Sequence, residues 1–206
     1  MLDYLERALP AGATAHAYLL TGPPQVGKFT TALAIARLML CPTPPACGVC
    51  RHCRLAQRRS HPDLRVLERP ADRRTIPLRD VHDFMQGLAL KPMEAERKVY
   101  IVRGAEDLAE EGANALLKTI EEPPPAVTLL LTASSATALL PTIVSRCQVA
   151  ALRPVPPAEI AAYLAESLGL EADRAETIAR VSKGRPGWAI LAAQNSDLLD
   201  ERRQHS

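Results

Sequence analysis

The sequence has 206 residues, which is enough for one domain of ordinary size and a small second one. Its 47% hydrophobic and 23% charged residues are typical of a globular protein, and no apolar run reaches the roughly 18 residues that a membrane-spanning helix needs. The net charge of +2 gives no reason to expect strong independent binding to nucleic acid. The N-terminus lacks the apolar core of a signal peptide, so we expect a cytoplasmic protein that makes no membrane contact.

Short β-like runs alternate with helical patterns along the first three quarters of the chain. Strands are expected at residues 15–21, 63–68, 98–104, 127–133 and 147–152, and helices at residues 29–40, 77–90 and within 106–125. Strands separated by helices predict an α/β fold with a parallel sheet and helices on both of its faces. Ligands of such folds bind at the carboxyl ends of the strands.

The composition changes at "RPVPP" (153–157). Three helical patterns follow it, and strand character is absent there. We therefore predict a core domain at residues 1–153 and a small all-helical domain at residues 154–206, joined by a proline-rich linker.

The segment "GPPQVGKFT" predicts a phosphate-binding loop between the first strand and the first helix. In such a loop, glycines such as Gly22 and Gly27 free backbone N–H groups to surround phosphates at a helix N-terminus, and a lysine such as Lys28 reaches the terminal phosphates. A fortuitous glycine-rich turn is the alternative.

The residues that should bind magnesium are missing from this loop and from the sheet. The Ser or Thr expected after Lys28 is Phe29, and the tip of the strand at 98–104 is Arg103-Gly104, where an acid is expected. An arginine there would repel Mg²⁺. We therefore expect no ATP hydrolysis by this chain, while the retained loop leaves nucleotide binding open.

Four cysteines cluster within "CPTPPACGVCRHC". Cys41, Cys47, Cys50 and Cys53 have the spacing that lets four thiolates surround one tetrahedral Zn²⁺ in a structural site. An iron–sulfur cluster, a disulfide pair and four reduced buried cysteines are the alternatives. Nearby, "RRSHPD" (58–63) is either a phosphate contact or a solvated basic turn.

Several of these segments together resemble one family. The segments "HAYLLTGPPQVGK", the Cys-x₅-Cys-x₂-Cys-x₂-Cys insert, "SHPDL", "ANALLKTIEEPP" and "SRC" occur in this order in the bacterial DNA polymerase III clamp-loader ATPases of the AAA+ class. The resemblance covers nearly the whole chain. It implies an AAA+ P-loop core with a Cys₄ zinc module inserted at about residues 41–60, followed by a helical lid domain.

Within that family, the gamma/tau subunits keep the magnesium ligands, whereas the delta-prime subunits characteristically lose them. Phe29 and Arg103-Gly104 resemble the delta-prime pattern, and Gly187 in "KGRPGWA" stands where active members carry a sensor arginine. The resemblance implies a non-hydrolysing subunit that works with gamma/tau and delta subunits to load the sliding clamp on primed DNA. A gamma/tau-like ATPase and a standalone zinc and nucleotide-binding module are the alternatives.

One functional residue is implied by the resemblance alone. "PTIVSRCQV" matches the family's Ser-Arg-Cys motif, whose arginine, here Arg146, would act as a finger in the ATP site of a neighbouring subunit. A surface arginine in a salt bridge is the alternative. Family members usually continue into a helical collar domain, so we expect either a truncated chain or a short natural version.

Overall fold

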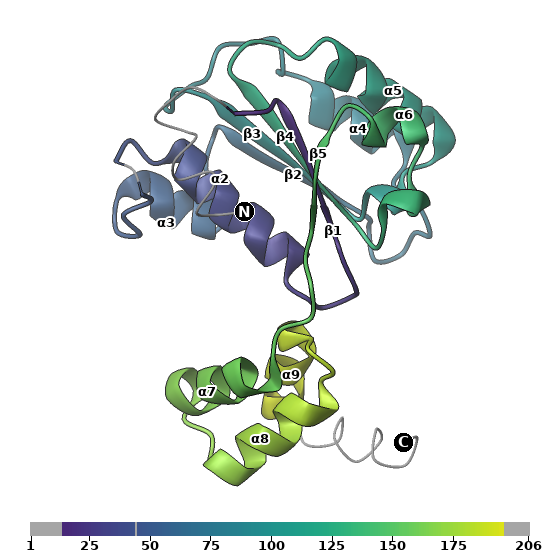
Figure 1. The fold of residues 1–206 in the computed structure, drawn as a ribbon. Coiled ribbons are helices and arrows are strands. Elements are labelled where there is room, and N and C mark those ends of the chain that lie inside the picture. Colours follow the sequence, from purple (N-terminus) through teal and green to yellow (C-terminus); the bar gives the residue numbers. More distant parts are fainter. Residues whose placement is uncertain (1–13, 44, 196–206) are drawn as a thin grey trace. The chain divides into compact units, whose positions relative to one another are not determined.

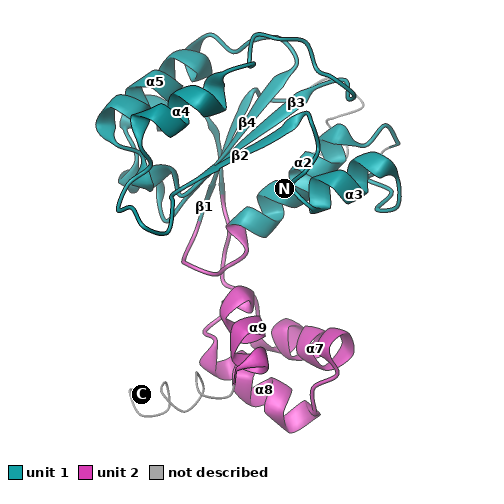
Figure 2. Ribbon diagram, turned by 180° about the vertical axis from the view of Figure 1, so that it is seen from behind, with its two compact units in different colours: residues 1–21, 29–150 teal, residues 22–28, 151–206 magenta. Residues whose placement is uncertain are grey.

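The computed structural model describes residues 14–43 and 45–195, which form two compact units (Figure 2). The first unit contains the residues up to Thr21 together with Phe29–Ala150, and the second contains Gly22–Lys28 together with the residues from Ala151 onward. The phosphate loop therefore groups with the C-terminal helices. The N-terminal segment considered for a signal peptide and the end of the third helical pattern lie outside the described residues.

Unit 1 is built on a five-stranded sheet in the order β2-β3-β4-β1-β5. Neighbouring strands pair in parallel from β2 to β3, from β3 to β4 and from β4 to β1. The strands are β1 (Ala17–Thr21), β2 (Leu64–Glu68), β3 (Lys98–Arg103), β4 (Val127–Ala133) and β5 (Gln148–Ala151).

Helices cover both faces of this sheet, as the sequence predicts (Figure 1). One face carries α2 (Lys28–Leu40) and α3 (Arg51–Gln57), and the other carries α4 (Leu78–Met85), α5 (Glu110–Glu121) and α6 (Pro141–Val144). Two short 3₁₀ helices, η1 (Ala105–Asp107) and η2 (Ala136–Ala138), follow β3 and β4. The helix expected at 77–90 ends at Met85, because Gly87 adopts a positive φ of 81° that a helix does not allow.

The central strands owe their position to continuous apolar sequence. Every residue of β1 and β4 is buried, whereas β2, at the edge of the sheet, contains buried, half-buried and exposed residues. The parallel register places Arg103 between Glu68 and Thr132 at the carboxyl edge of the sheet. Candidate ligand-binding side chains of three strands therefore meet at that edge.

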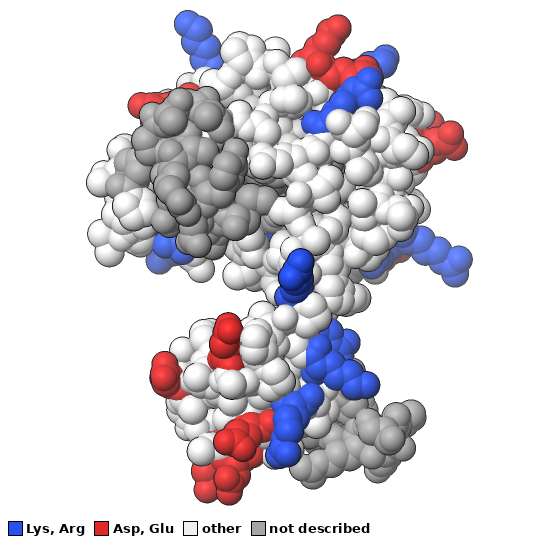
Figure 3. Space-filling model, in the orientation of Figure 1, with Lys and Arg blue, Asp and Glu red and all other residues white. Residues whose placement is uncertain are grey.

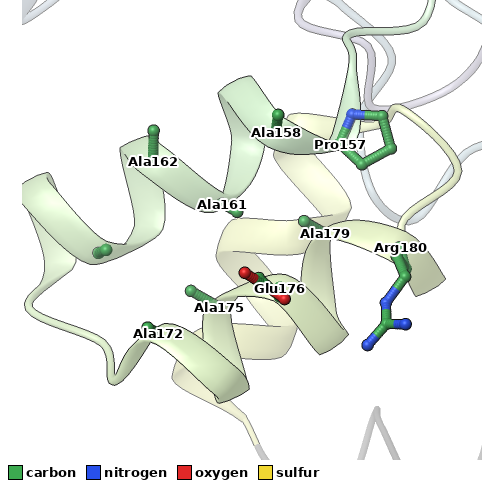
Figure 4. Close-up of a pocket in the computed structure, with 10 residues that line it drawn as sticks. Pro157, Ala158, Ala161, Ala162, Ala172, Ala175, Glu176, Ala179 and Arg180 are labelled. Atoms are coloured by element: carbon green, nitrogen blue, oxygen red, sulfur yellow. The ribbon is translucent and has the colours of Figure 1, made fainter.

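Unit 2 contains the three predicted C-terminal helices. They are α7 (Pro157–Leu168), α8 (Ala172–Val181) and α9 (Pro186–Gln194), and they enclose a small core around Leu164, Ile178 and Trp188. A cavity of about 500 Å³ between α7 and α8 is lined mostly by alanines (Figure 4). Glu176 and Arg180 are the charged residues that line it, so it offers little chemistry for catalysis. Among the described helices, none combines the length and the apolar character that crossing a membrane would require.

Candidate metal centre and phosphate loop

The four clustered cysteines converge at the junction of α2 and α3. Cys41 follows the last turn of α2, and Cys50 is the N-cap of α3. The Cys41 Sγ lies 3.8 Å from the Cys47 Sγ and 3.9 Å from the Cys50 Sγ, and all four sulfurs lie within 4.8 Å of one another. Tetrahedral zinc with Zn–S bonds of about 2.3 Å separates its sulfurs by about 3.8 Å. The cysteines are free rather than disulfide-bonded.

Backbone donors prepare this group for a cation. The N–H groups of Cys50 and Cys53 point at the sulfurs of Cys47 and Cys50, each at 3.4 Å. Hydrogen bonds from the backbone N–H groups of Val49 and Cys50 lower the pKa of Cys47 to about 6, whereas burial raises the pKa of Cys53 to about 12. The buried thiol therefore needs a bound cation to ionise. This donor set fits a structural metal ion with four thiolate ligands.

A second group of metal-ligand side chains lies beside the cysteines. His52 Nδ1 and His61 Nε2 are 2.8 Å apart, and the Glu94 carboxylate is close to both. The Asp63 N–H donates to His61 Nδ1 at 3.0 Å, so the neutral His61 ring carries its proton on Nε2 and donates it to His52. His61 thus directs an N–H rather than a lone pair into the group, and this arrangement is a hydrogen-bonded pair.

The phosphate loop runs from Gly22 to Lys28. Gly22 has a φ of 147°, and a Cβ there would lie 2.6 Å from the Leu152 carbonyl oxygen, so glycine is required. The Lys28 Nζ donates to the carbonyl oxygens of Gly22 (2.7 Å) and Pro23 (2.9 Å). The lysine that would reach a phosphate is thus hydrogen-bonded to carbonyl groups of its own loop.

The start of α9, where the family resemblance led us to look for a sensor arginine, packs against the same loop. The Gly187 N–H donates to the Gln25 carbonyl oxygen at 2.9 Å, and a Cβ on Gly187 would lie 2.9 Å from that oxygen. A side chain is therefore excluded at this position. Both residues belong to unit 2, so the contact is internal to that unit.

The two residues that stand at the magnesium positions touch each other, which the sequence did not reveal. The Arg103 guanidinium carbon lies 5.0 Å from the centre of the Phe29 ring, and that of Arg59 lies 4.4 Å from it. Both arginines also pair with Glu68, Arg103 at 2.9 Å and Arg59 at 3.5 Å. Glu68 was not predicted as a site residue, and Arg59 was considered only as part of the basic turn at 58–63, because no local pattern links these positions to Phe29 and Arg103.

The acids beside this cluster are engaged elsewhere. Glu106 accepts the Ser134 N–H at 2.8 Å, and Asp107 pairs with Arg69 at 3.1 Å. The cavity at the strand tips has a volume of about 310 Å³ and is lined by acids and arginines together. Its cationic groups therefore stand where a magnesium site would need carboxylates.

Arg146 lies just after α6. Its side chain is 41% exposed and pairs with Glu121 at 3.0 Å. It also donates to the Thr142 carbonyl oxygen at 3.0 Å and to Ser145 Oγ at 3.3 Å. The structure thus holds Arg146 in an exposed ion pair at the surface.

Comparisons with known proteins identify the family. The model described as "DNA polymerase III, delta subunit" matches residues 1–156. The chain is 36% identical over 195 residues to DNA polymerase III subunit delta' of Haemophilus influenzae, which covers 93% of this chain and 59% of the relative. It is also 36% identical over 150 residues to DNA polymerase III subunit tau of Escherichia coli, which covers 71% of this chain and 23% of the relative.

The fold has solved neighbours as well. The RuvB Holliday junction branch migration motor of Thermotoga maritima superposes with a TM-score of 0.64 at 20% identity, over 98% of this chain and 66% of that chain. This likeness concerns the AAA+ fold alone. The chain spans 59% of the length of its Haemophilus influenzae relative. From the family match and the similarity to delta', we conclude that the chain belongs to the DNA polymerase III delta subunit family and resembles its delta' members.

Proposed function

We propose that this chain is a clamp-loader subunit that does not hydrolyse ATP itself and that contributes Arg146 to the ATP site of a neighbouring subunit. It would work in the cytoplasm with gamma/tau and delta subunits, and through that assembly act on the sliding clamp and primed DNA. Residues 1–153 would form the AAA+ core and residues 154–206 the lid. The names of the relatives, delta' and tau, support this placement.

The contact between Phe29 and Arg103 is the observation that carries the proposal. ATP hydrolysis in P-loop proteins needs Mg²⁺, held by a hydroxyl after the loop lysine and by an acid at a strand tip. Phe29 provides no oxygen ligand, and Arg103 brings a positive charge that is already paired with Glu68. A divalent cation would face two guanidinium groups around an aromatic ring, so its binding here is unfavourable.

Loss of hydrolysis does not prevent Arg146 from working in trans. A guanidinium stabilises the charge that develops on the transferring γ-phosphoryl group. In the isolated chain, the exposed pair of Arg146 with Glu121 holds the side chain at the surface. Exposed ion pairs contribute only about 0–1 kcal/mol to stability. A phosphate of the ATP bound to a neighbouring subunit could therefore replace Glu121 as the partner of Arg146 at little cost.

We also propose that the cysteine centre holds one structural Zn²⁺ per chain. Cys41, Cys47, Cys50 and Cys53 would supply four thiolates and leave no position for water, so the ion would have no catalytic role. Its function would be to hold together a proline- and glycine-rich segment that has few apolar residues of its own.

Two assays test the proposed function. The isolated chain should show no magnesium-dependent ATP turnover, whereas several turnovers per minute would favour a gamma/tau-like ATPase instead. In a complex reconstituted with gamma/tau and delta subunits, Arg146→Ala should leave assembly intact and lower DNA-stimulated ATP hydrolysis by about tenfold or more. Arg79→Ala is the matched control, because its side chain is 86% exposed and lies on α4. Equal turnover of the Arg146→Ala complex and the control would remove the finger assignment.

A further inference from the structure

Three arginines beside the cysteine centre line a pocket that the proposed function leaves unused. Arg37 comes from the last turn of α2, Arg54 from the last turn of α3, and Arg58 is the C-cap of α3. With Gly48 and Gln57 they line a cavity of about 350 Å³. In Figure 1, α2 and α3 lie together on one face of the sheet. Among the residues that the structure describes, no acidic side chain lines this cavity.

The three guanidinium groups lack the partners that neighbouring arginines have. Arg51 pairs with Glu94 and Arg59 pairs with Glu68. By contrast, none of the three pocket arginines forms an ion pair within the described part of the chain. Their positive charge is therefore left uncompensated by protein carboxylates.

The hydrogen bonds of the pocket leave a donor unused. Arg37 Nη1 donates to Gln57 Oε1 at 3.0 Å, and Arg54 Nη1 donates to the Val49 carbonyl oxygen at 2.8 Å. The buried Nε–H of Arg37 has no acceptor among residues 14–43 and 45–195. Buried donors without an acceptor are unfavourable and are usually satisfied by a ligand, water or ion.

We propose that this pocket binds a phosphate group. Guanidinium groups remain charged at every physiological pH, and their planar forks match the oxygens of phosphate in a bidentate geometry. The phosphate could belong to a nucleic-acid backbone or to a free phosphate compound, and both present the same oxyanion. This proposal is independent of whether the chain hydrolyses ATP and of the role of Arg146.

Two structural roles compete for these arginines. Cations near the last turn of a helix interact favourably with its dipole. In addition, a metal ion with four thiolate ligands carries net negative charge, and Arg37 Nη2 would lie 3.4 Å from a Cβ placed on Gly48, next to the cysteines. Arg58 is separable from the second role, because its side chain is exposed and shows no hydrogen bond among the described residues, and a contribution to the α3 dipole would appear as a change in melting temperature rather than in phosphate binding alone. It is therefore the best position for a test.

The charge distribution limits how many phosphates are involved. On the face shown in Figure 3, Lys and Arg side chains of unit 1 are scattered and do not form one broad basic surface. On a nucleic acid, whose backbone offers adjacent phosphates, the three arginines of this site would contact at most two or three of them. Each phosphate contact contributes about −0.9 to the slope of log K against log salt for duplex DNA, so binding to DNA would be weak, with a slope of about −2 to −3.

The test uses the 206-residue chain loaded with zinc. Binding of a fluorescent 20-base-pair duplex is measured by anisotropy at several salt concentrations, and binding of inorganic phosphate by calorimetry at constant ionic strength. The variants are Arg58→Gln and Arg54→Gln/Arg58→Gln. The control is Arg74→Gln/Arg79→Gln, which removes two exposed charges elsewhere on unit 1. Zinc content and melting temperature are measured for every variant.

The expected result is binding of inorganic phosphate that falls at least fivefold in Arg58→Gln and further in the double variant, with the control unchanged. If the phosphate comes from nucleic acid, the slope of log K against log salt for duplex binding is also less steep in the double variant than in wild type, by about 2. If duplex binding is unchanged while phosphate binding falls, the site serves a free phosphate compound. Equal binding of both ligands by the control and by Arg58→Gln, at normal zinc content, would overturn the proposal.

Discussion

Replacing Gly187 by alanine tests how closely the start of α9 packs on the phosphate loop. At helical positions with ordinary φ, alanine normally stabilises a protein by about 0.5–1 kcal/mol relative to glycine. Gly187 is helical and has no positive φ, so the default expectation for Gly187→Ala is increased stability. The structure predicts the opposite sign.

The reversal comes from the contact with Gln25. The new Cβ would lie 2.9 Å from the Gln25 carbonyl oxygen, which is backbone and cannot rotate away. Crowding of this kind costs about 1–3 kcal/mol, and lengthening of the Gly187 N–H to Gln25 bond adds part of the 0.5–1.5 kcal/mol that a hydrogen bond contributes. After subtracting the helix-propensity gain, we expect Gly187→Ala to destabilise unit 2 by about 1–2 kcal/mol.

The single tryptophan of the chain makes this measurable. Trp188 follows Gly187 directly and is 8% exposed in the core of unit 2, so its fluorescence reports unfolding of that unit. Urea unfolding of wild type and Gly187→Ala would be followed by this signal. Ala193→Gly, in the same helix, measures what glycine costs there without the loop contact. A Gly187→Ala protein that is more stable than wild type would show that the loop does not press against α9.

Three further expectations concern unit 1. The first concerns the contact between the Phe29 ring and the Arg103 guanidinium. A double-mutant cycle of Phe29→Leu and Arg103→Gln, measured by chemical unfolding followed by circular dichroism, should give a coupling energy of about 0.5–1 kcal/mol. Independent effects of the two changes on the free energy of unfolding would contradict this contact. A strong chelator should release about one equivalent of zinc per chain and lower the melting temperature of unit 1. The Cys53→Ser variant should purify with less than about half an equivalent of zinc. A normal zinc content in that variant would show that the metal binds at another site. Burial alone would raise the pKa of Asp63, but N–H donors from Met93, Ala95 and Glu94 outweigh it and lower the pKa below its ordinary value of 3.8. The stability that Asp63 contributes is therefore present above pH about 4 and is lost as the pH falls through the lowered pKa. In Asp63→Asn, the free energy of unfolding should depend less on pH on the acid side than in wild type. An unchanged pH dependence there would contradict this role of Asp63.

The central strands could be predicted because their signal is local and strong. The runs at 98–104 and 127–133 are rich in apolar and β-branched residues, and they became β3 and β4 with bounds within one residue of the expectation. A parallel strand that is buried on both faces needs mostly apolar side chains at consecutive positions, so its burial can be predicted from a short stretch of sequence. The cysteine centre was predictable for a similar reason, since the turns between its ligands are short.

Other features depend on residues that are distant in sequence. The helix α3 has only seven residues, too few for a periodic pattern, and its N-cap is the metal-ligand candidate Cys50. The contacts of Phe29 with Arg59 and Arg103 join residues from three separate parts of the chain. The sequence alone identified Phe29 and Arg103 as unsuited to binding magnesium. Only the folded structure shows that Arg59 lies beside them.

The contact between Phe29 and Arg103 also bears on how such a subunit could change over evolution. Restoring threonine at Phe29 alone would remove the ring that Arg103 packs on while leaving a positive charge at the metal position. Restoring an acid at Arg103 alone would place it opposite Glu68, its register partner on β2, and would remove the closer of the two arginines that pair with Glu68. Each single reversion is therefore unfavourable before the other is made, so a lineage that has reached this pair would be held there by mutual dependence, whether or not hydrolysis would still be useful to it.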